Sequence, residues 1–129
     1  MPDISDNTFV NNKILIGQPP AQKEILEKTL LAILQYYDID LQTFYSPDSR
    51  RDLFISTIRH EFVFLIKANT DLGTKKLSQY CKVSRNVIRY GVEKIEVHKK
   101  IYGQTLRNLD AVVKICNSFE KKHEWHLHN

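Results

Sequence analysis

The chain has 129 residues and a formal net charge of +4, and 42% of its residues are hydrophobic and 26% charged. This length fits one domain and excludes a large enzyme with its own nucleotide-binding domain. The composition is that of a globular chain rather than a disordered one. No apolar run approaches the roughly 18 residues that span a bilayer, and residues 1–12 lack the pattern of a secretory signal. Cys81 and Cys116 lie far apart in no metal-ligand pattern, so we expect a reducing, cytoplasmic setting.

The distribution of charge is more informative than its total. Residues 50–100 contain twelve basic and five acidic side chains, for a net charge of +7, whereas the rest of the chain carries −3. A basic block between mildly acidic flanks is typical of a protein that binds a polyanion, and nucleic acid is the commonest one. A set of solvated helix faces would give the same count, so charge alone leaves both interpretations open.

The first forty-five residues predict an arm, a long helix and a short one. Residues 1–20 are expected to form a flexible arm, because residues 17–20 (Gly-Gln-Pro-Pro) block regular structure before the first helix. Residues 21–37 then carry apolar side chains at the spacing of an amphipathic helix. These side chains are Leu26, Leu30, Ile33, Leu34 and Tyr37. Residues 38–40 end that helix, and Asp40 is expected to cap a helical turn over residues 41–45.

A second long helix is predicted over residues 52–68, after a loop that ends in two arginines. Its buried face is expected to hold Ile55, Ile58, Phe62, Leu65 and Ile66. Arg59 and Lys67 fall outside this face, so we expect them to contact water or a ligand. Phe54 and Phe64 do not both fit the inward face, so one of them is expected to be partly exposed and to mark a partner surface.

Residues 74–101 form the most informative segment. Thr74 is expected to cap a short helix over residues 75–81, and Ser84 is expected to cap a longer helix that ends near residue 101. A short helix, a turn of a few residues and a longer capped helix form the outline of a helix-turn-helix. The inward-facing residues of the longer helix are expected to be Ile88, Val92 and Ile95.

The opposite face of this longer helix carries polar side chains in its first turns, namely Arg85, Asn86, Arg89 and Tyr90. Arginine can form two hydrogen bonds with guanine, and asparagine can do the same with adenine. Lys75, Lys76 and Lys82 nearby would add sequence-independent attraction to phosphates. An ordinary exposed helix face is the alternative interpretation of the same residues.

The C-terminal part predicts a final helix and a polar tail. The helix is expected to begin near Thr105, and the residues that should dock it on the core are Leu106, Leu109, Val113, Cys116 and Phe119. Residues 121–129 are polar and contain three closely spaced histidines, His123, His126 and His128. Their spacing is not H-E-x-x-H, and a flexible tail supplies no second group to orient the ligands, so we expect no metal site. We find no arrangement of residues for catalysis.

Residues 25–119 resemble the C-terminal DNA-binding domain of the bacterial replication initiator DnaA, whose fold resembles that of Trp repressor. The resemblance rests on order and spacing more than on identity. Residues 35–41 (QYYDIDL) are similar to the family's tyrosine-rich helix end, and residues 59–67 align with its long second helix. Residues 84–95 (SRNVIRYGVEKI) occupy the place of its recognition helix. The resemblance implies an all-α domain of five or six helices that contains a helix-turn-helix.

The family's DNA contacts carry over to particular positions of this chain. Arg50 and Arg51 lie where the family has its basic loop, and Arg51 matches the arginine that enters the minor groove. Arg59 and Lys67 match basic positions that approach bases or the DNA backbone. The family's Asp-His-Thr-Thr signature is replaced by Ser84, Arg85, Asn86 and Val87. The resemblance therefore implies DNA binding at a site different from the usual initiator box.

We predict that residues 21–120 form a bacterial domain that binds double-stranded DNA in replication or in the regulation of a mobile element. The chain lacks the G-x-x-x-x-G-K-[ST] motif, so we expect neither a bound nucleotide nor another cofactor, and no enzymatic activity. The candidate DNA-binding residues are Arg50, Arg51, Arg59, Lys67, Lys75, Lys76, Lys82, Ser84, Arg85, Asn86 and Arg89. The alternative is a DnaA-like module that has lost DNA reading and binds another protein.

Overall fold

A computed structural model describes residues 20–46, 52–81, 83–119 and 125–127, and the chain in these ranges is all-α, as predicted. The described residues form six helices and no strand. The helices are α2 (Pro20–Tyr37), α3 (Leu41–Tyr45), α4 (Leu53–Asn69), α5 (Thr74–Cys81), α6 (Arg85–Ile101) and α7 (Gly103–Ser118). None of these six is long and apolar enough to cross a membrane.

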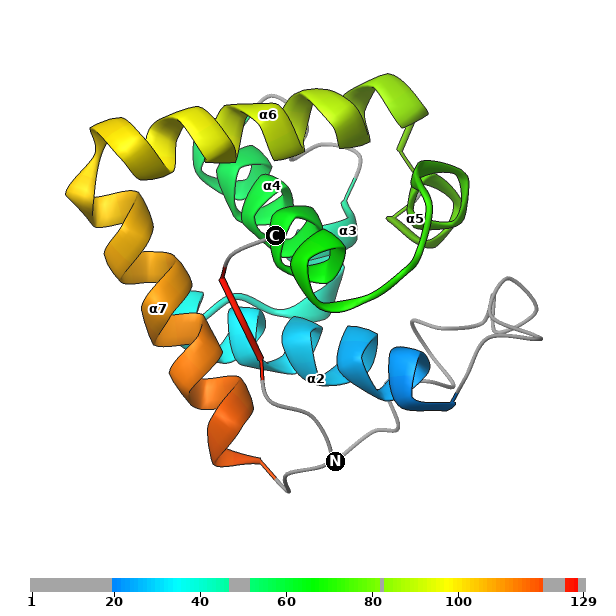
Figure 1. Ribbon diagram of the computed structural model, residues 1–129, viewed down its shortest axis with the longest axis horizontal. Coiled ribbons are helices and arrows are strands. Elements are labelled where there is room, and N and C mark those ends of the chain that lie inside the picture. The colour runs from blue at the N-terminus through cyan, green and yellow to red at the C-terminus, as the bar shows by residue number, and fades with distance from the viewer. Residues whose placement is uncertain (1–19, 47–51, 82, 120–124, 128–129) are drawn as a thin grey trace.

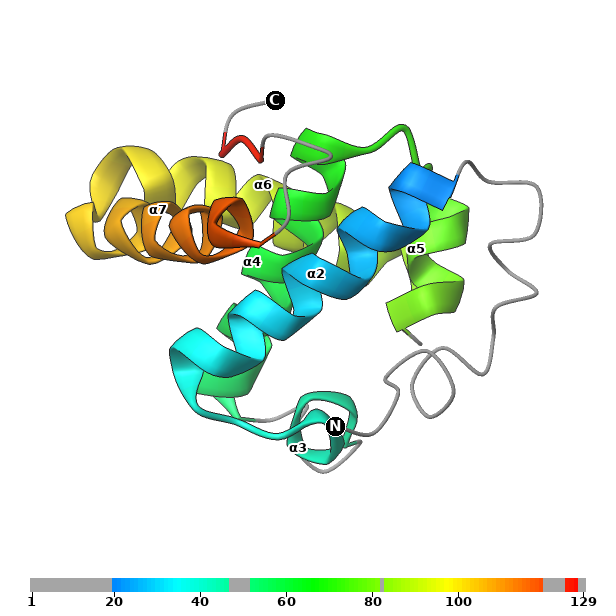
Figure 2. The same cartoon turned by 90° about the horizontal axis from the view of Figure 1, so that it is seen from below.

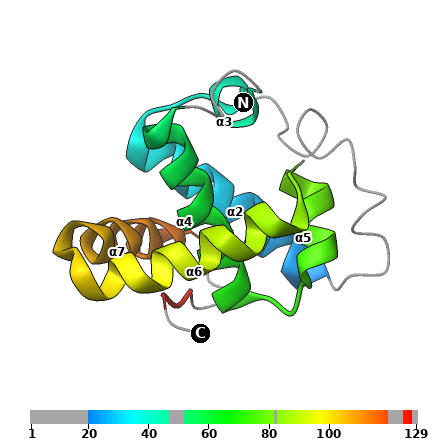
Figure 3. The ribbon, with the colours of Figure 1, turned by 90° about the horizontal axis from the view of Figure 1, so that it is seen from above.

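Helix α4 lies at the centre of the molecule. It packs between α6 on one side and α2 on the other, and α7 closes a third side by packing on both α2 and α6 (Figure 1). The short helices α3 and α5 lie at the periphery, α3 against α4 and α5 against α6 (Figures 2 and 3). The long outer face of α6 is therefore left uncovered by the other described helices.

The burial of α4 follows from its sequence. The five residues predicted for its inward face are all buried, and Phe64 is buried as well, whereas Phe54 is 54% exposed. The expectation that one of these two phenylalanines is exposed is thus confirmed. All six residues from 61 to 66 are buried, so neighbouring elements cover this stretch of the helix on every side, as in a helix at the centre of a core.

Short polar side chains cap the starts of α3 and α4; the cap at Asp40 was predicted, whereas Asp52 was expected inside the helix that it caps. The Asp40 carboxylate accepts a hydrogen bond from the Thr43 backbone N–H at 2.7 Å, and the Asp52 carboxylate accepts one from Phe54 at 2.9 Å. Asp38 has φ = 53°, a left-handed conformation that an aspartate tolerates at the residue after a helix end. These caps satisfy backbone groups that the helix itself leaves without partners.

Helix α7 differs from its prediction. It begins at Gly103 rather than near Thr105, because Tyr102 is the single residue between it and α6. This early start sets the rotation of the helix so that Thr105 is buried, whereas Leu106, which was expected to dock on the core, is 40% exposed. Leu109, Val113 and Cys116 are buried as predicted, so Cys116 is a small core residue.

The tail also contributes to the core, contrary to its prediction as a polar extension. Trp125 is 4% exposed, and its indole N–H donates to the Thr29 hydroxyl of α2 at 2.9 Å. Its backbone N–H donates to the side chain of Asn117 in α7 at 3.0 Å. The His126 backbone exchanges two hydrogen bonds of 2.8 Å with the side-chain amide of Asn69 in α4. Residues 125–127 therefore lie across α2, α4 and α7 (Figures 1 and 2).

A buried carboxyl group joins α4 to two other helices. Glu61 is 1% exposed, and the Tyr37 hydroxyl of α2 donates a hydrogen bond to it. Burial raises the pKa of Glu61 to about 7, although hydrogen bonds from Tyr37 and from Asn108 of α7 act to lower it. Asn108 in turn accepts a hydrogen bond from the Tyr36 hydroxyl at 2.8 Å. Glu61 is therefore half-protonated near neutral pH within a polar contact between three helices.

Replacement of Trp125 by alanine should destabilise the fold by roughly 3–5 kcal/mol, because it removes a large buried side chain. Urea unfolding followed by circular dichroism measures this loss. His126→Ala is the matched control, since that neighbouring side chain is exposed, and it should change the free energy of unfolding by less than about 0.5 kcal/mol. Equal stabilities of the two variants would show that residues 125–127 contribute nothing to the core.

Glu61 should make the fold less stable as pH rises. The folded chain keeps the Glu61 proton up to about pH 7, whereas an exposed glutamate loses it near pH 4.5. Relative to Glu61→Gln, the wild-type free energy of unfolding should fall by roughly 3 kcal/mol between these pH values. Burial lowers the pKa of His60 to about 4, which makes both proteins more stable as pH rises. The quantity to measure is therefore the difference between their free energies of unfolding, in which the His60 contribution cancels. A pH-independent difference would contradict this assignment.

Candidate nucleic-acid interface

Helices α5 and α6 lie where the sequence predicts a short helix followed by a longer one. Helix α5 begins at Thr74, one residue earlier than predicted, and the Gly73 carbonyl accepts the N–H of Leu77 at 3.1 Å. Residues 82–84 connect it to α6, and the two helices pack on each other with a steep crossing (Figures 1 and 3). Ser84 caps α6 as predicted, because its hydroxyl accepts the Val87 backbone N–H at 3.2 Å.

The approach of α6 to α4 depends on a glycine in the middle of the helix. Gly91 is buried against the ring of His60, and a Cβ atom at position 91 would lie 2.6 Å from the His60 Cδ2 atom. Any side chain there would push the two helices apart. Ile88 and Ile95 are buried on the same side of α6, and Val92 is half-buried, in line with the prediction for this face.

The first two turns of α6 present a group of exposed polar side chains. Arg85, Asn86 and Arg89 are all exposed, as is the cap residue Ser84. The Arg89 guanidinium donates to the Asn86 side-chain oxygen at 3.3 Å, so these two side chains lie next to each other. Tyr90 is 60% exposed beside them. Two arginines, an amide and a phenol thus share one surface at the start of the helix.

Other predicted contact residues surround this group less closely. Lys75 is exposed and Lys76 half-buried in the first turn of α5, and Lys67 is half-buried in the last turn of α4. Arg50, Arg51 and Lys82 lie outside the described residues. Of the eleven predicted DNA-binding residues, the structure therefore brings four together, Ser84, Arg85, Asn86 and Arg89.

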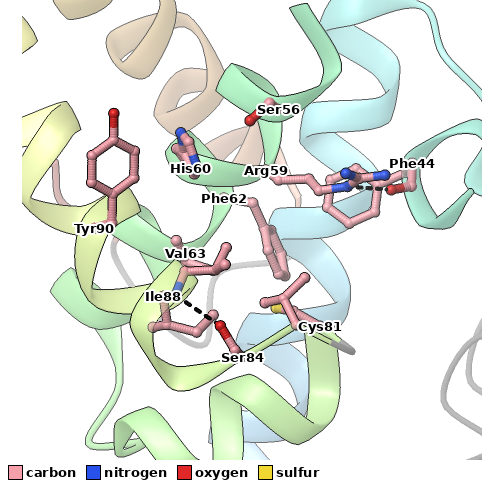
Figure 4. Close-up of a pocket in the computed structure, with 12 residues that line it drawn as sticks. Phe44, Ser56, Arg59, His60, Phe62, Val63, Cys81, Ser84, Ile88 and Tyr90 are labelled. Carbon is pink, nitrogen blue, oxygen red and sulfur yellow. Dashed lines mark hydrogen bonds between the residues drawn. The ribbon is translucent and has the colours of Figure 1, made fainter. Parts of the chain in front are cut away.

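Arg59 has a structural role that the sequence did not predict. It was expected to contact water or a ligand, but its side chain is half-buried and points toward α3 (Figure 4). Its Nε donates to the Phe44 carbonyl at 2.7 Å and its Nη2 donates to the Ser46 carbonyl at 3.0 Å. These carbonyls belong to the end of α3, so Arg59 ties the end of that short helix to α4.

Basic side chains occur along the whole of α6, but beyond its first turns they are mixed with acidic and apolar side chains. Further along the helix Glu93 is exposed, and Lys99 lies 3.6 Å from the Glu96 carboxylate and 4.9 Å from the centre of the Phe64 ring. Val97 and Ile101 are 52% and 64% exposed. The outer face is therefore polar and basic at its start, and further along it mixes exposed apolar side chains with charged ones such as Lys100.

A cleft of about 610 Å³ lies beside the start of α6, where α4, α3 and the end of α5 meet (Figure 4). Its wall includes His60, Ser84 and Tyr90, together with a cysteine. Burial raises the pKa of that Cys81 thiol to about 12, so it is protonated and unreactive at neutral pH. The described residues contain no group of three or more side chains suited to a metal ion.

Sequence reasoning identified the exposed start of α6 but missed this cleft. The one signal in the sequence was Gly91, since a glycine in the interior of a helix marks a position where another element approaches closely. The chain matches no protein-family model, no curated protein and no solved structure.

Arg59→Ala should lower the free energy of unfolding by roughly 1–3 kcal/mol, because it leaves two carbonyls at the end of α3 without their donor. Arg89→Ala provides a matched control, since Arg89 is exposed on α6, and its effect should stay below about 0.5 kcal/mol. Urea unfolding at neutral pH compares the two. An Arg59→Ala protein as stable as wild type would show that Arg59 does not hold α3 in place.

Proposed function

We propose that this chain is a DnaA-like bacterial domain that binds double-stranded DNA through the first turns of α6, without catalysis. The observation that carries the proposal is the exposed group of Arg85, Asn86 and Arg89 in the first turns of α6, directly after the cap residue Ser84. These side chains offer the donors and acceptors that base edges in the major groove require. The domain would act in the cytoplasm, in replication or in the regulation of a mobile element.

Electrostatics supports the same orientation on DNA. The N-terminal end of a helix carries a partial positive charge, and its first N–H groups attract phosphate. Arg85 and Arg89 add two full charges at this end of α6, and Lys75 is exposed on the helix packed beside it. In this orientation the two arginines and Asn86 would read bases, while Lys75 would attract phosphates irrespective of sequence. Arg51 would reach the adjacent minor groove.

The replaced signature bears on which sequence is read. Ser84, Arg85, Asn86 and Val87 stand where the DnaA family has Asp-His-Thr-Thr, and Arg85 and Asn86 offer different hydrogen-bonding groups from that signature. We therefore propose a target other than the initiator box.

A protein-interaction module is the second candidate, and a separate surface favours it. Val97, Ile101, Tyr102 and Leu106 are each at least 40% exposed and lie where α6 meets α7. A group of exposed apolar side chains of this kind is typical of a protein-binding surface. Binding through it would persist at high salt, whereas DNA binding weakens steeply as salt rises.

A fluorescence titration against a pool of random duplexes, with the tight binders sequenced, tests the first candidate. We expect one enriched sequence and an affinity that falls steeply as the salt concentration is raised. Absence of binding even at low salt would overturn the DNA-binding proposal and leave the protein-interaction module.

Arg85→Ala should weaken binding to the enriched sequence by roughly 1–3 kcal/mol and relax specificity at one base pair. Lys75→Ala should weaken binding to all duplexes about equally and reduce the salt slope by about one. Lys114→Ala is the control, since Lys114 is an exposed lysine on α7 that pairs with Asp110 at 2.9 Å. If Arg85→Ala bound the enriched sequence as tightly as wild type, the proposed orientation of α6 on DNA would be wrong.

A further inference from the structure

The far end of α6 carries an apolar surface that none of the described helices covers. Helix α6 turns into α7 at the end that lies away from α5 (Figures 1 and 3). We call the exposed apolar side chains at this turn the corner surface; they are Val97, Ile101, Tyr102 and Leu106, each at least 40% exposed. Neighbouring apolar side chains exposed to water are typical of a surface that another molecule covers.

Two side chains of opposite charge flank the corner surface on α6. Glu93 and Lys100 are both exposed and lie seven residues apart, with Val97 between them. Seven residues make almost two full helical turns, so these two side chains lie on the same edge of the helix, within about 20° of each other around its axis. This edge of α6 therefore runs from an acidic residue past an apolar one to a basic one.

The other lysines in this half of the helix are directed elsewhere. Lys99 lies 3.6 Å from the Glu96 carboxylate and 4.9 Å from the centre of the Phe64 ring. The Nζ atom of Lys94 lies 6.0 Å from the centre of the Tyr90 ring, in the preceding turn. The edge beside the corner surface is thus formed by one acidic and one basic side chain.

This pattern is complementary to itself. A two-fold axis perpendicular to α6 near Val97 would place the α6 helix of a second copy antiparallel to the first. The midpoint between positions 93 and 100 lies beside Val97, so Glu93 of each copy would face Lys100 of the other. The two Val97 side chains would meet between these two ion pairs. The order acidic, apolar, basic therefore favours a second copy of this chain over a partner of unrelated sequence.

We propose that the corner surface is the interface of a symmetric homodimer in which two α6 helices cross antiparallel at Val97. Closed two-fold dimers are the commonest oligomers, and in them the same surface of both subunits meets. Removal of the apolar side chains from water would drive the association, and the two pairs of Glu93 with Lys100 would fix the direction in which the helices run. Because the interface is small, we expect a dissociation constant in the micromolar range.

The dimer also fits the spacing of DNA half-sites, a consequence that rests on the proposed function. Helix α6 starts about eleven residues before the two-fold axis, so in a nearly antiparallel pair the two starts would lie about 33 Å apart. Two half-sites one helical turn apart on DNA are separated by about 34–36 Å. The dimer would therefore present Arg85 and Asn86 of both copies to successive major grooves.

Sedimentation equilibrium of the full chain from about 5 to about 500 µM tests the dimer without DNA. The mean mass should rise from that of one chain toward that of two as the concentration increases. Val97→Asp should weaken self-association at least about tenfold, because it places a charge at the centre of the interface. Val87→Asp is the matched control, since Val87 is 43% exposed on α6 outside this interface, and it should associate like wild type.

Exchange of the two charges tests the antiparallel arrangement. Glu93→Lys and Lys100→Glu, each alone, should weaken dimerisation about tenfold, because each turns both ion pairs into repulsions. The protein that carries both substitutions should dimerise like wild type, since both pairs are restored with their signs reversed. Circular dichroism should show wild-type helix content for every variant, because the substituted positions are exposed.

Three results would overturn the proposal. These are a monomer at the highest concentration, self-association that Val97→Asp leaves unchanged, and a double exchange that dimerises no better than the single exchanges. Duplexes enriched from the random pool should contain two inverted half-sites about one helical turn apart, and single copies would refute the paired orientation on DNA. A dimer that binds no duplex would refute the proposed function alone, whereas a monomer that binds DNA would refute the dimer alone.

Discussion

The burial of α4 on all sides is the constraint on which the rest of the structure depends. A helix whose six central residues are all buried must be covered from several directions, and α2 and α6 provide the two largest covering surfaces. This arrangement places two neighbouring polar residues in the interior. Glu61 faces Tyr37 and Asn108, whereas His60 faces Gly91 on α6, so each side of the central helix carries one buried titratable group.

The same constraint explains why α6 has an uncovered outer face. Gly91 and Ile88 fix the inner face of α6 against α4, and the single residue Tyr102 turns the chain directly into α7, which packs on α2 as well. No other described helix then remains to cover the opposite side of α6. The polar residues in its first turns and the apolar residues in its last turn are therefore exposed together, although their chemistry differs.

Much of the fold could be predicted from apolar spacing and capping residues. The inward residues of α4, the caps Asp40 and Ser84, and the two helices at residues 74–101 follow from local rules that depend on neighbours within one turn. The exposure of Arg85, Asn86 and Arg89 follows from the same periodicity. These side chains occupy the face opposite Ile88.

What could not be predicted depends on contacts between residues distant in the sequence. The described residue after Trp125 and those before it in the sequence are polar, so no apolar pattern marks Trp125 as a core residue. Its position in the core depends on contacts such as the hydrogen bond to Thr29, 96 residues earlier. Arg59 looked like a surface cation because its partners are carbonyls of α3, which carry no sequence signal. Leu106 fits the apolar spacing of Leu109, Val113 and Cys116, but it is exposed because the one-residue connection at Tyr102 sets which face of α7 turns inward.

The start of α6 lies between the exposed polar group and the cleft. Ser84 and Val87 line the cleft, and they also belong to the exposed first turn that carries Arg85 and Asn86. The hydroxyl of Ser84 holds the Val87 N–H, so movement of either residue changes the cap of the helix. The side chains exposed for contact and the side chains that pack toward the cleft therefore alternate within one turn, so the cap that Ser84 provides positions both.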